Sequence, residues 1–164
     1  MAADLGRDQR QVHLIDAAGQ IAQHTGQGCV PWAGHVAGSD ASVAGNMLAG
    51  PAVIADTLAA FEATDQLPLA ERLLAALDAG EAAGGDKRGR QSAALMVWHT
   101  ERWAELDIRA DDHAAPLEEL RRLYAVSNQH WAVFRRHLAT AANPTGTLDR
   151  TVILAELAAH QAAS

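Results

Sequence analysis

Residues 84–98 read GGDKRGRQSAALMVW, and the change of composition inside this stretch separates helical from extended parts of the chain. Residues 84–90 form a charged, glycine-rich loop, and residues 91–98 form a short apolar run typical of a buried strand. The residues before the loop have helical spacing, and a second strand pattern follows the run. The loop therefore predicts a connection from a helix to a strand.

Two helices are predicted before this loop. Gly50 and Pro51 begin a helix over 51–64, because proline at the first helical position gives up an N–H that has no partner there. A second helix is predicted over 68–78, and Gly80 is expected to end it. Its apolar residues recur at i, i+3, i+4 and i+7, namely Ala70, Leu73, Leu74 and Leu77.

Extended segments are predicted ahead of these helices. Residues 10–26 indicate a β-hairpin, because polar and apolar residues alternate on both sides of a turn at 16–19. Residues 26–40 indicate an ordered loop or an irregular strand, and residues 42–48 indicate a short strand.

The rest of the chain is expected to contain one more strand and then helices. Residues 104–110 alternate, a strand pattern that places Leu106, Ile108 and Ala110 on one face. Pro116 opens a helix, and residues 148–162 form a last one. Between them a shared helical face is expected for Trp131, Phe134 and Leu138. Runs of strands and of helices without strict βαβ alternation predict the α+β class.

Composition excludes several classes of function. The 164 residues carry 20 acidic and 13 basic side chains, a net charge of −7, whereas non-specific nucleic-acid binding needs clustered Lys and Arg. The single cysteine, Cys29, allows no internal disulfide and fits a reducing compartment. Residues 1–7 lack the apolar core of a signal peptide, and no apolar run could span a bilayer. We expect a cytoplasmic protein with no nucleic-acid or membrane partner.

The glycine-rich loop has two interpretations. Its glycines suggest phosphate binding, but a P-loop lies between a strand and a helix, and this loop follows a helix. A tight connection whose glycines adopt positive φ is the preferred interpretation. Asp86, Arg88, Gln91 and Ser92 form an unusual concentration of polar groups beside a buried strand. They are expected to pair with one another or, as a close second interpretation, to line a cleft.

Metal and nucleophile patterns are weak. Asp111, Asp112 and His113 are adjacent, but neighbouring strand residues point to opposite faces, so no metal site and no cofactor are predicted. Cys29 with His24 or His35 forms only a loose Cys–His pattern, because a catalytic set is recognised by geometry rather than by nearness in sequence. Ser92 lacks the G-x-S-x-G elbow that exposes a nucleophile.

Several blocks of the sequence together resemble one known family. The blocks are residues 10–19, 24–26, 29–35, 45–51, 71–77, 83–94, 107–113 and 117–123. They resemble domain-of-unknown-function family 1028, which is placed among the N-terminal-nucleophile (Ntn) hydrolase-like folds. The resemblance implies a four-layer αββα sandwich, incomplete at the N-terminus, over residues 1–125. Residues 126–164 are expected to form a helical extension packed on the same domain.

The resemblance also implies a reaction class. In the Ntn class an N-terminal Thr, Ser or Cys attacks an amide, and its own α-amino group acts as the base. Family members begin with a threonine-led strand, a second strand and a helical segment, whereas this chain opens close to the third strand. Removal of Met1 would expose Ala2, which has no nucleophilic atom. No catalytic residue is therefore predicted in this chain.

Three functions are carried forward, and whether the chain is an enzyme stays open. The first is an Ntn hydrolase-like amidohydrolase in its complete form, acting on a small amide, with this chain inactive alone. The main alternative is a non-catalytic binding or assembly module that keeps the sandwich fold. The third is a small-molecule-binding domain that uses residues 84–92.

The missing first strands predict a partner and a remaining cleft. They leave a sheet edge unpaired, so we expect a homo-oligomer or a complementing N-terminal segment. Asn46, Asp86, Arg88 and Gln91 are the candidate cleft residues. Asn46 would donate to an oxyanion if it faced the nucleophile, and otherwise it satisfies backbone groups beside Gly45.

Overall fold

A computed structural model describes residues 3–163 and shows an α+β protein that divides into two compact units, the first ending at Arg90 and the second beginning at Gln91. Ala2, discussed above as an N-terminal residue, lies outside the described residues. The first unit contains a short 3₁₀ turn at Arg7–Gln9, then β1 (Gln11–Ile15), β2 (Ile21–Thr25), β3 (Gly34–Ala37), β4 (Ser42–Gly45), α1 (Ala52–Ala63) and α2 (Leu69–Ala82). The second contains β5 (Ala93–Val97), β6 (Leu106–Ala110), α3 (Pro116–Ser127), α4 (Trp131–Phe134), a 3₁₀ turn at Arg135–His137 and α5 (Arg150–Ala163). The domain limits expected from the sequence, 1–125 and 126–164, stay a prediction.

The N-terminal hairpin forms where the alternation predicts it. β1 and β2 pair antiparallel, with Gln11 opposite Thr25 and Ile15 opposite Ile21. Asp16 organises the turn, because its Oδ1 accepts the N–H groups of Ala18 and Gln20, each at 2.8 Å. The turn ends at Gly19, whose φ of 78° is a conformation that glycine adopts readily.

A second hairpin follows. β3 and β4 pair antiparallel from Gly34–Gly45 to Ala37–Ser42. β3 is therefore a regular strand within residues 26–40, for which the sequence indicated a loop or an irregular strand. The signal is faint because β3 has only four residues, two of them Gly34 and Ala37, which have low strand propensity.

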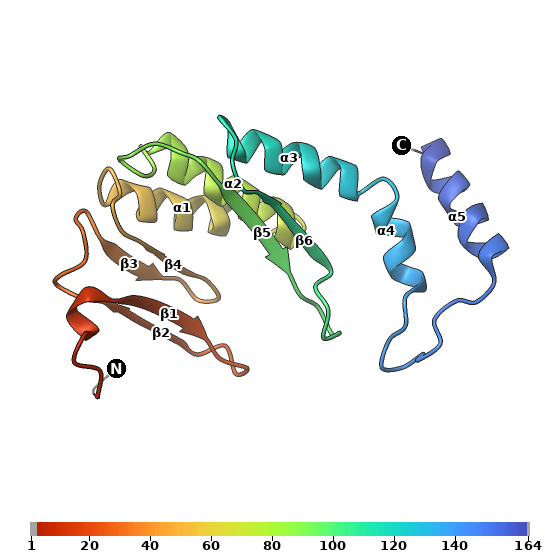
Figure 1. Ribbon diagram of the computed structural model, residues 1–164, viewed down its shortest axis with the longest axis horizontal. Coiled ribbons are helices and arrows are strands. Elements are labelled where there is room, and N and C mark those ends of the chain that lie inside the picture. The colour runs from red at the N-terminus through yellow and green to blue at the C-terminus, as the bar shows by residue number, and fades with distance from the viewer. Residues whose placement is uncertain (1–2, 164) are drawn as a thin grey trace. The chain divides into compact units, whose positions relative to one another are not determined.

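The elements of the first unit lie in layers (Figure 1). The β1–β2 hairpin lies against the β3–β4 hairpin, α1 packs on the far side of β3–β4, and α2 packs on α1. The core between the two helices is apolar, and its buried members are Val53, Ile54, Leu58 and Phe61 of α1 with Ala70, Leu74 and Ala76 of α2.

The predicted end of α2 at Gly80 is wrong, because the helix continues to Ala82. Gly80 is buried against α1, where a Cβ atom would lie 2.4 Å from Thr57 Oγ1. The missing side chain thus lets the two helices approach closely. This packing outweighs the cost of about 1 kcal/mol that glycine brings to a helix interior.

The second unit is built on the β5–β6 hairpin and α3. Ala93 pairs with Ala110 and Val97 with Leu106. The predicted inner face of β6 is confirmed, because Leu106 and Ala110 are buried while Asp107 and Arg109 are exposed. Leu120 of α3 is completely buried in this unit.

The helical face predicted from Trp131, Phe134 and Leu138 is wrong. α4 has only four residues, the chain then tightens into a 3₁₀ turn, and Leu138 has extended backbone with ψ 158°. The three side chains are 38 %, 40 % and 37 % exposed, whereas Val133 is fully buried. A shared face needs a continuous helix through residue 138, and that helix is absent. Among the helices of residues 3–163, none has the length and apolar character needed to cross a membrane.

Candidate functional site

Asp86 and Arg88, two of the predicted cleft residues, bind each other. Arg88 Nη2 lies 2.6 Å from Asp86 Oδ2, and Arg88 Nε donates to Asp86 Oδ1 at 3.0 Å. The backbone N–H of Arg88 donates to the same Oδ1 at 2.8 Å. These contacts, the Arg88 side chain first, lower the pKa of Asp86 to about 2. The preferred sequence interpretation, pairing of the loop's polar groups with one another, describes this contact.

The glycine-rich loop has the geometry of a tight connection. Gly84, Gly85 and Gly89 have φ values of 114°, 52° and 103°. Five N–H groups of the loop donate within the protein. Those of Gly84 and Gly85 donate to the end of α2, that of Lys87 to Met47 O, and those of Arg88 and Gly89 to Asp86. A phosphate cradle needs such groups free to face an anion. The loop is a structural turn, not a P-loop.

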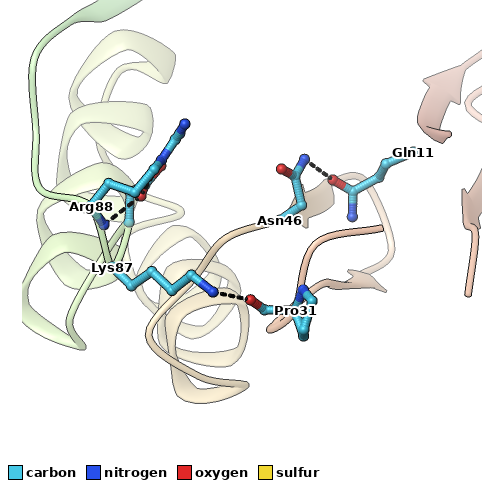
Figure 2. Close-up of polar contacts among 6 residues, drawn as sticks. Gln11, Pro31, Asn46, Lys87 and Arg88 are labelled. Carbon is cyan, nitrogen blue, oxygen red and sulfur yellow. Dashed lines mark hydrogen bonds and ion pairs between the residues drawn. The ribbon is translucent and has the colours of Figure 1, made fainter. Parts of the chain in front are cut away.

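Three segments meet beside this loop, and we call residues 30–32, 47–49 and 85–87 the loop junction. Met47 N donates to Val30 O at 3.1 Å, and Leu48 N donates to Trp32 O at 3.0 Å. Ala49 N and Lys87 N complete the junction with bonds of 2.9 Å to Gly85 O and Met47 O. Lys87 Nζ also donates to Pro31 O at 2.5 Å, as Figure 2 shows.

Asn46 lies next to the loop junction but turns toward the first hairpin. Its side chain is exposed, and Nδ2 donates to Gln11 Oε1 at 3.1 Å (Figure 2). In the residues described, the bonds of Asn46 and those of the Asp86–Arg88 pair form separate groups. Asn46 therefore belongs to the polar contacts of the hairpins.

Gln11 joins all four strands of the first unit. From β1, the two N–H groups of its Nε2 are shared among three acceptors: Thr25 Oγ1 at 3.0 Å, Gly34 O at 2.9 Å and Gly45 O at 2.9 Å. Gln23 repeats this role from β2, with Nε2 2.7 Å from Val36 O and 2.9 Å from Ser42 Oγ. The layer between the hairpins is thus held together by hydrogen bonds. Neither glutamine was a sequence candidate, although each occupies a polar position of a predicted strand.

Two histidines extend these contacts. His35 Nδ1 lies 2.8 Å from Thr25 Oγ1, and His13 Nδ1 lies 2.7 Å from Ser42 Oγ. Thr25 and His35 also line an open hollow of about 450 Å³, together with Cys29 and Trp32. His24, the other histidine of the proposed Cys–His pattern, bonds to Arg7 O instead, at 2.9 Å.

The family follows from comparison with known proteins. A model of the family of unknown function DUF1028 matches residues 1–120. The chain belongs to this family. A DUF1028 protein from Silicibacter pomeroyi has a similar crystal structure, with a TM-score of 0.81 and 33 % sequence identity. The match covers 91 % of this chain and 64 % of that protein, so this chain spans less than two thirds of that protein's length. No curated protein matches the chain.

The remaining site candidates of this DUF1028 chain lie elsewhere. Gln91 belongs to the second unit, where its carbonyl accepts the N–H of His113 at 2.9 Å. His113 Nδ1 in turn accepts the N–H of Ala115 at 3.0 Å. Across residues 3–163, no group of three or more His, Cys, Asp or Glu residues converges as metal ligands do.

Proposed function

We propose that this chain is the helix-backed part of a two-sheet amidohydrolase domain of the Ntn type, and that it acts on small amides only after a further segment of the family fold joins it. One observation carries the proposal: the β1–β2 hairpin directs four polar side chains, beside Ile15 and Ile21, toward β3–β4 and leaves Val12 and Leu14 on its outer side. Gln11, His13, Gln23 and Thr25 share the side that bonds to or faces β3–β4. The outer side carries Val12, Leu14, Ala22 and His24.

The outer side of β1–β2 is unusual for a strand pair in water. Val12 is 41 % exposed and Leu14 is 52 % exposed, so about half of each of these apolar residues is left uncovered. Soluble domains normally place such a face against another layer. In a four-layer αββα sandwich, helices cover both outer sides, and α1 supplies this cover only for β3–β4.

A further segment of the family fold is the occupant we assign to this face. More than a third of the Silicibacter pomeroyi protein lies outside its match to this chain, while the matched part has the same fold. A second copy of this chain is the competing occupant. The unpaired edges of the two-stranded sheets in the first unit offer the same segment backbone hydrogen bonds.

The inner layer supplies groups suited to an amide. A carboxamide both donates and accepts, and Asn46 has a second N–H beside the one that it gives to Gln11. In the Ntn mechanism the joining segment would bring the nucleophile and its α-amine. Asn46 would then donate to the developing oxyanion, a contribution that is typically worth about 3–4 kcal/mol.

A non-catalytic binding or assembly module is the second candidate, and the Asp86–Arg88 pair favours it. Both charged groups of the predicted cleft are engaged with each other, and Asp86 stays ionised well below neutral pH. Neither group is then available as a general acid or base near neutrality. The same fold would then bind the segment without catalysis.

One experiment separates these functions. The purified chain is assayed with small p-nitroanilide amides, alone and with a recombinant segment made of the part of the Silicibacter pomeroyi protein outside the match. We expect binding of the segment and hydrolysis in the mixture only. Leu14→Lys should abolish binding, while Leu67→Lys, at a 37 % exposed residue between α1 and α2, should not.

The other outcomes are equally informative. Binding without hydrolysis favours the non-catalytic module. Self-association that Leu14→Lys abolishes identifies a second copy as the occupant. Hydrolysis by the chain alone, or failure of the segment to bind, refutes the proposal.

A further inference from the structure

The first unit contains the same hydrogen-bonded arrangement twice, and we call each copy a Gln–hydroxyl–His unit. In the first, Gln11 donates to Thr25 Oγ1 at 3.0 Å and His35 Nδ1 lies 2.8 Å from the same oxygen. In the second, Gln23 donates to Ser42 Oγ at 2.9 Å and His13 Nδ1 lies 2.7 Å away. Each glutamine also donates to a carbonyl of β3, so both units fasten the two hairpins together.

The first Gln–hydroxyl–His unit faces a hollow that the second does not line. Thr25 and His35 line the open space of about 450 Å³, and neither Ser42 nor His13 does. His35 is exposed, and Trp32 provides an aromatic wall. A hydroxyl within hydrogen-bond reach of an imidazole is the nucleophile–base pair that nucleophilic catalysis uses, and here both groups line an open hollow. The contacts between the hairpins account for both Gln–hydroxyl–His units, but they do not account for the position of Thr25 and His35 at this hollow.

We propose that Thr25 is a nucleophile and His35 its general base, for acyl transfer from small activated esters. Thr25 Oγ1 attacks the ester carbonyl carbon, and the hydroxyl proton passes to His35 Nδ1. The Oγ1–C bond forms, the C–O bond to the leaving group breaks, and a threonyl ester remains. His35 gives that proton to solvent and becomes neutral again. It then takes a proton from a water molecule whose oxygen attacks the threonyl ester, and the C–Oγ1 bond breaks as the proton passes from His35 to Thr25 Oγ1, which releases the carboxylic acid and free Thr25.

Gln11 is the positioning residue of this pair. Its Nε2 can donate but not accept, so the hydroxyl proton of Thr25 is left for Nδ1 of His35 when the proton of His35 is on Nε2. The bonds of Gln11 to Gly34 O and Gly45 O, both 2.9 Å, fix its carboxamide in place. An activated ester is the appropriate substrate class because its leaving group departs without taking up a proton.

The residues of this site all belong to the compact unit that ends at Arg90. The site therefore does not depend on the segment invoked in the proposed function, on which this inference does not rest. Reaction at Thr25 by the chain alone would leave the amidohydrolase proposal untouched, since that proposal concerns amides and the outer face of β1–β2. Failure of the segment to bind would equally leave Thr25 and His35 in place. The two proposals therefore fail separately.

The probe is p-nitrophenyl acetate, with release of p-nitrophenolate followed by absorbance and the acetylated residue located by peptide mass spectrometry. All variants carry Cys29→Ala, because the thiol lines the same hollow and would react competitively. We expect acetyl on Thr25. Thr25→Val should abolish this label, and Thr25→Ser should keep it. His35→Gln keeps a hydrogen-bond acceptor near Thr25 but removes the base, and should slow acetylation about a hundredfold or more.

The second Gln–hydroxyl–His unit provides the matched control. Ser42→Ala and His13→Gln remove the corresponding groups away from the hollow and should leave acetylation of Thr25 unchanged. Acetyl found only on lysine side chains or on the N-terminal amine overturns the proposal. An unchanged acetylation rate in His35→Gln overturns it too, because Thr25 would then react without its base. If Thr25→Val fails to fold, Thr25→Ser still shows whether the hydroxyl at this position is acetylated.

Discussion

At the scale of single residues, Gln11 is half-buried, yet its side chain connects more strands than a half-buried position suggests. One carboxamide bonds to Thr25, Gly34 and Gly45, which belong to three different strands. Loss of a buried or half-buried hydrogen-bonding group leaves its partners unsatisfied, and this costs more than the net gain of an ordinary hydrogen bond.

Gln11→Leu should therefore destabilise the first unit. We expect the free energy of unfolding to fall by about 1–3 kcal/mol, because two backbone carbonyls and a hydroxyl lose a donor. Urea unfolding followed by circular dichroism measures the change. Gln20→Leu, at an exposed residue of the turn before β2, is the control and should have little effect. Equal losses in the two variants would show that the contacts of Gln11 carry no particular weight.

Asp86 gives the protein a defined dependence on pH. Its folded-state pKa of about 2 is below the ordinary 3.8, so the unfolded chain takes up the proton first as the pH falls. The stabilising contribution is complete above pH 3.8 and is lost between 3.8 and about 2. Asp86→Asn should flatten the stability curve in this window. An unchanged slope in Asp86→Asn would contradict the assignment.

At the scale of elements, the contact between α1 and α2 depends on Gly80. Gly80→Ala would improve helix propensity by about 1 kcal/mol, yet its Cβ would lie 2.4 Å from Thr57 Oγ1. Thr57 could rotate away only by giving up its 2.7 Å hydrogen bond to Val53 O. We expect a net loss of about 1–3 kcal/mol in thermal or urea unfolding, the usual cost of overpacking.

Two further variants test the cause of that loss. Thr57→Ala in the same chain should recover much of the stability, because it removes the atom that the new Cβ meets. Gly50→Ala serves as the control, since a Cβ at Gly50 would meet nothing within 4 Å. A Gly80→Ala protein as stable as the Gly50→Ala protein would mean that the helices can separate without cost.

The elements also show how far the sequence leads. The first hairpin, both N-terminal helices, β5, β6 and α3 were predictable, because each has a local pattern of alternation, helical spacing or a proline start. β3 and the continuation of α2 through Gly80 were not, since both depend on packing between elements. At the site, pairing of Asp86 with Arg88 was predictable because the residues are close in sequence. The bonds of Gln11, Thr25 and His35 were not, because separate hairpins bring these residues together.

At the scale of the whole molecule, the half-exposed apolar residues Val12 and Leu14 on the outer side of β1–β2 are the feature that most constrains function. Two-stranded sheets are marginal on their own, and each sheet in residues 3–163 has two strands. In the first unit, side-chain amides bond one hairpin to the other, while Val12 and Leu14 stay about half exposed. The chain belongs to the DUF1028 family, and its Silicibacter pomeroyi relative is longer. For this reason the proposed function assigns a further segment of the family fold to this face.

The reach of Gln11 along the chain also sets an order of events during folding. Each hairpin closes over a short turn, whereas the bond from Gln11 to Gly45 joins residues 34 positions apart. Closing a longer loop costs more chain entropy, so local hairpins form before contacts of this kind. We therefore expect the amide connections between the layers to form late in folding. Substitutions of Gln11 or Gln23 should therefore raise the rate of unfolding more than they lower the rate of folding. The lifetime of the folded first unit would shorten, while the time that it needs to fold would change little.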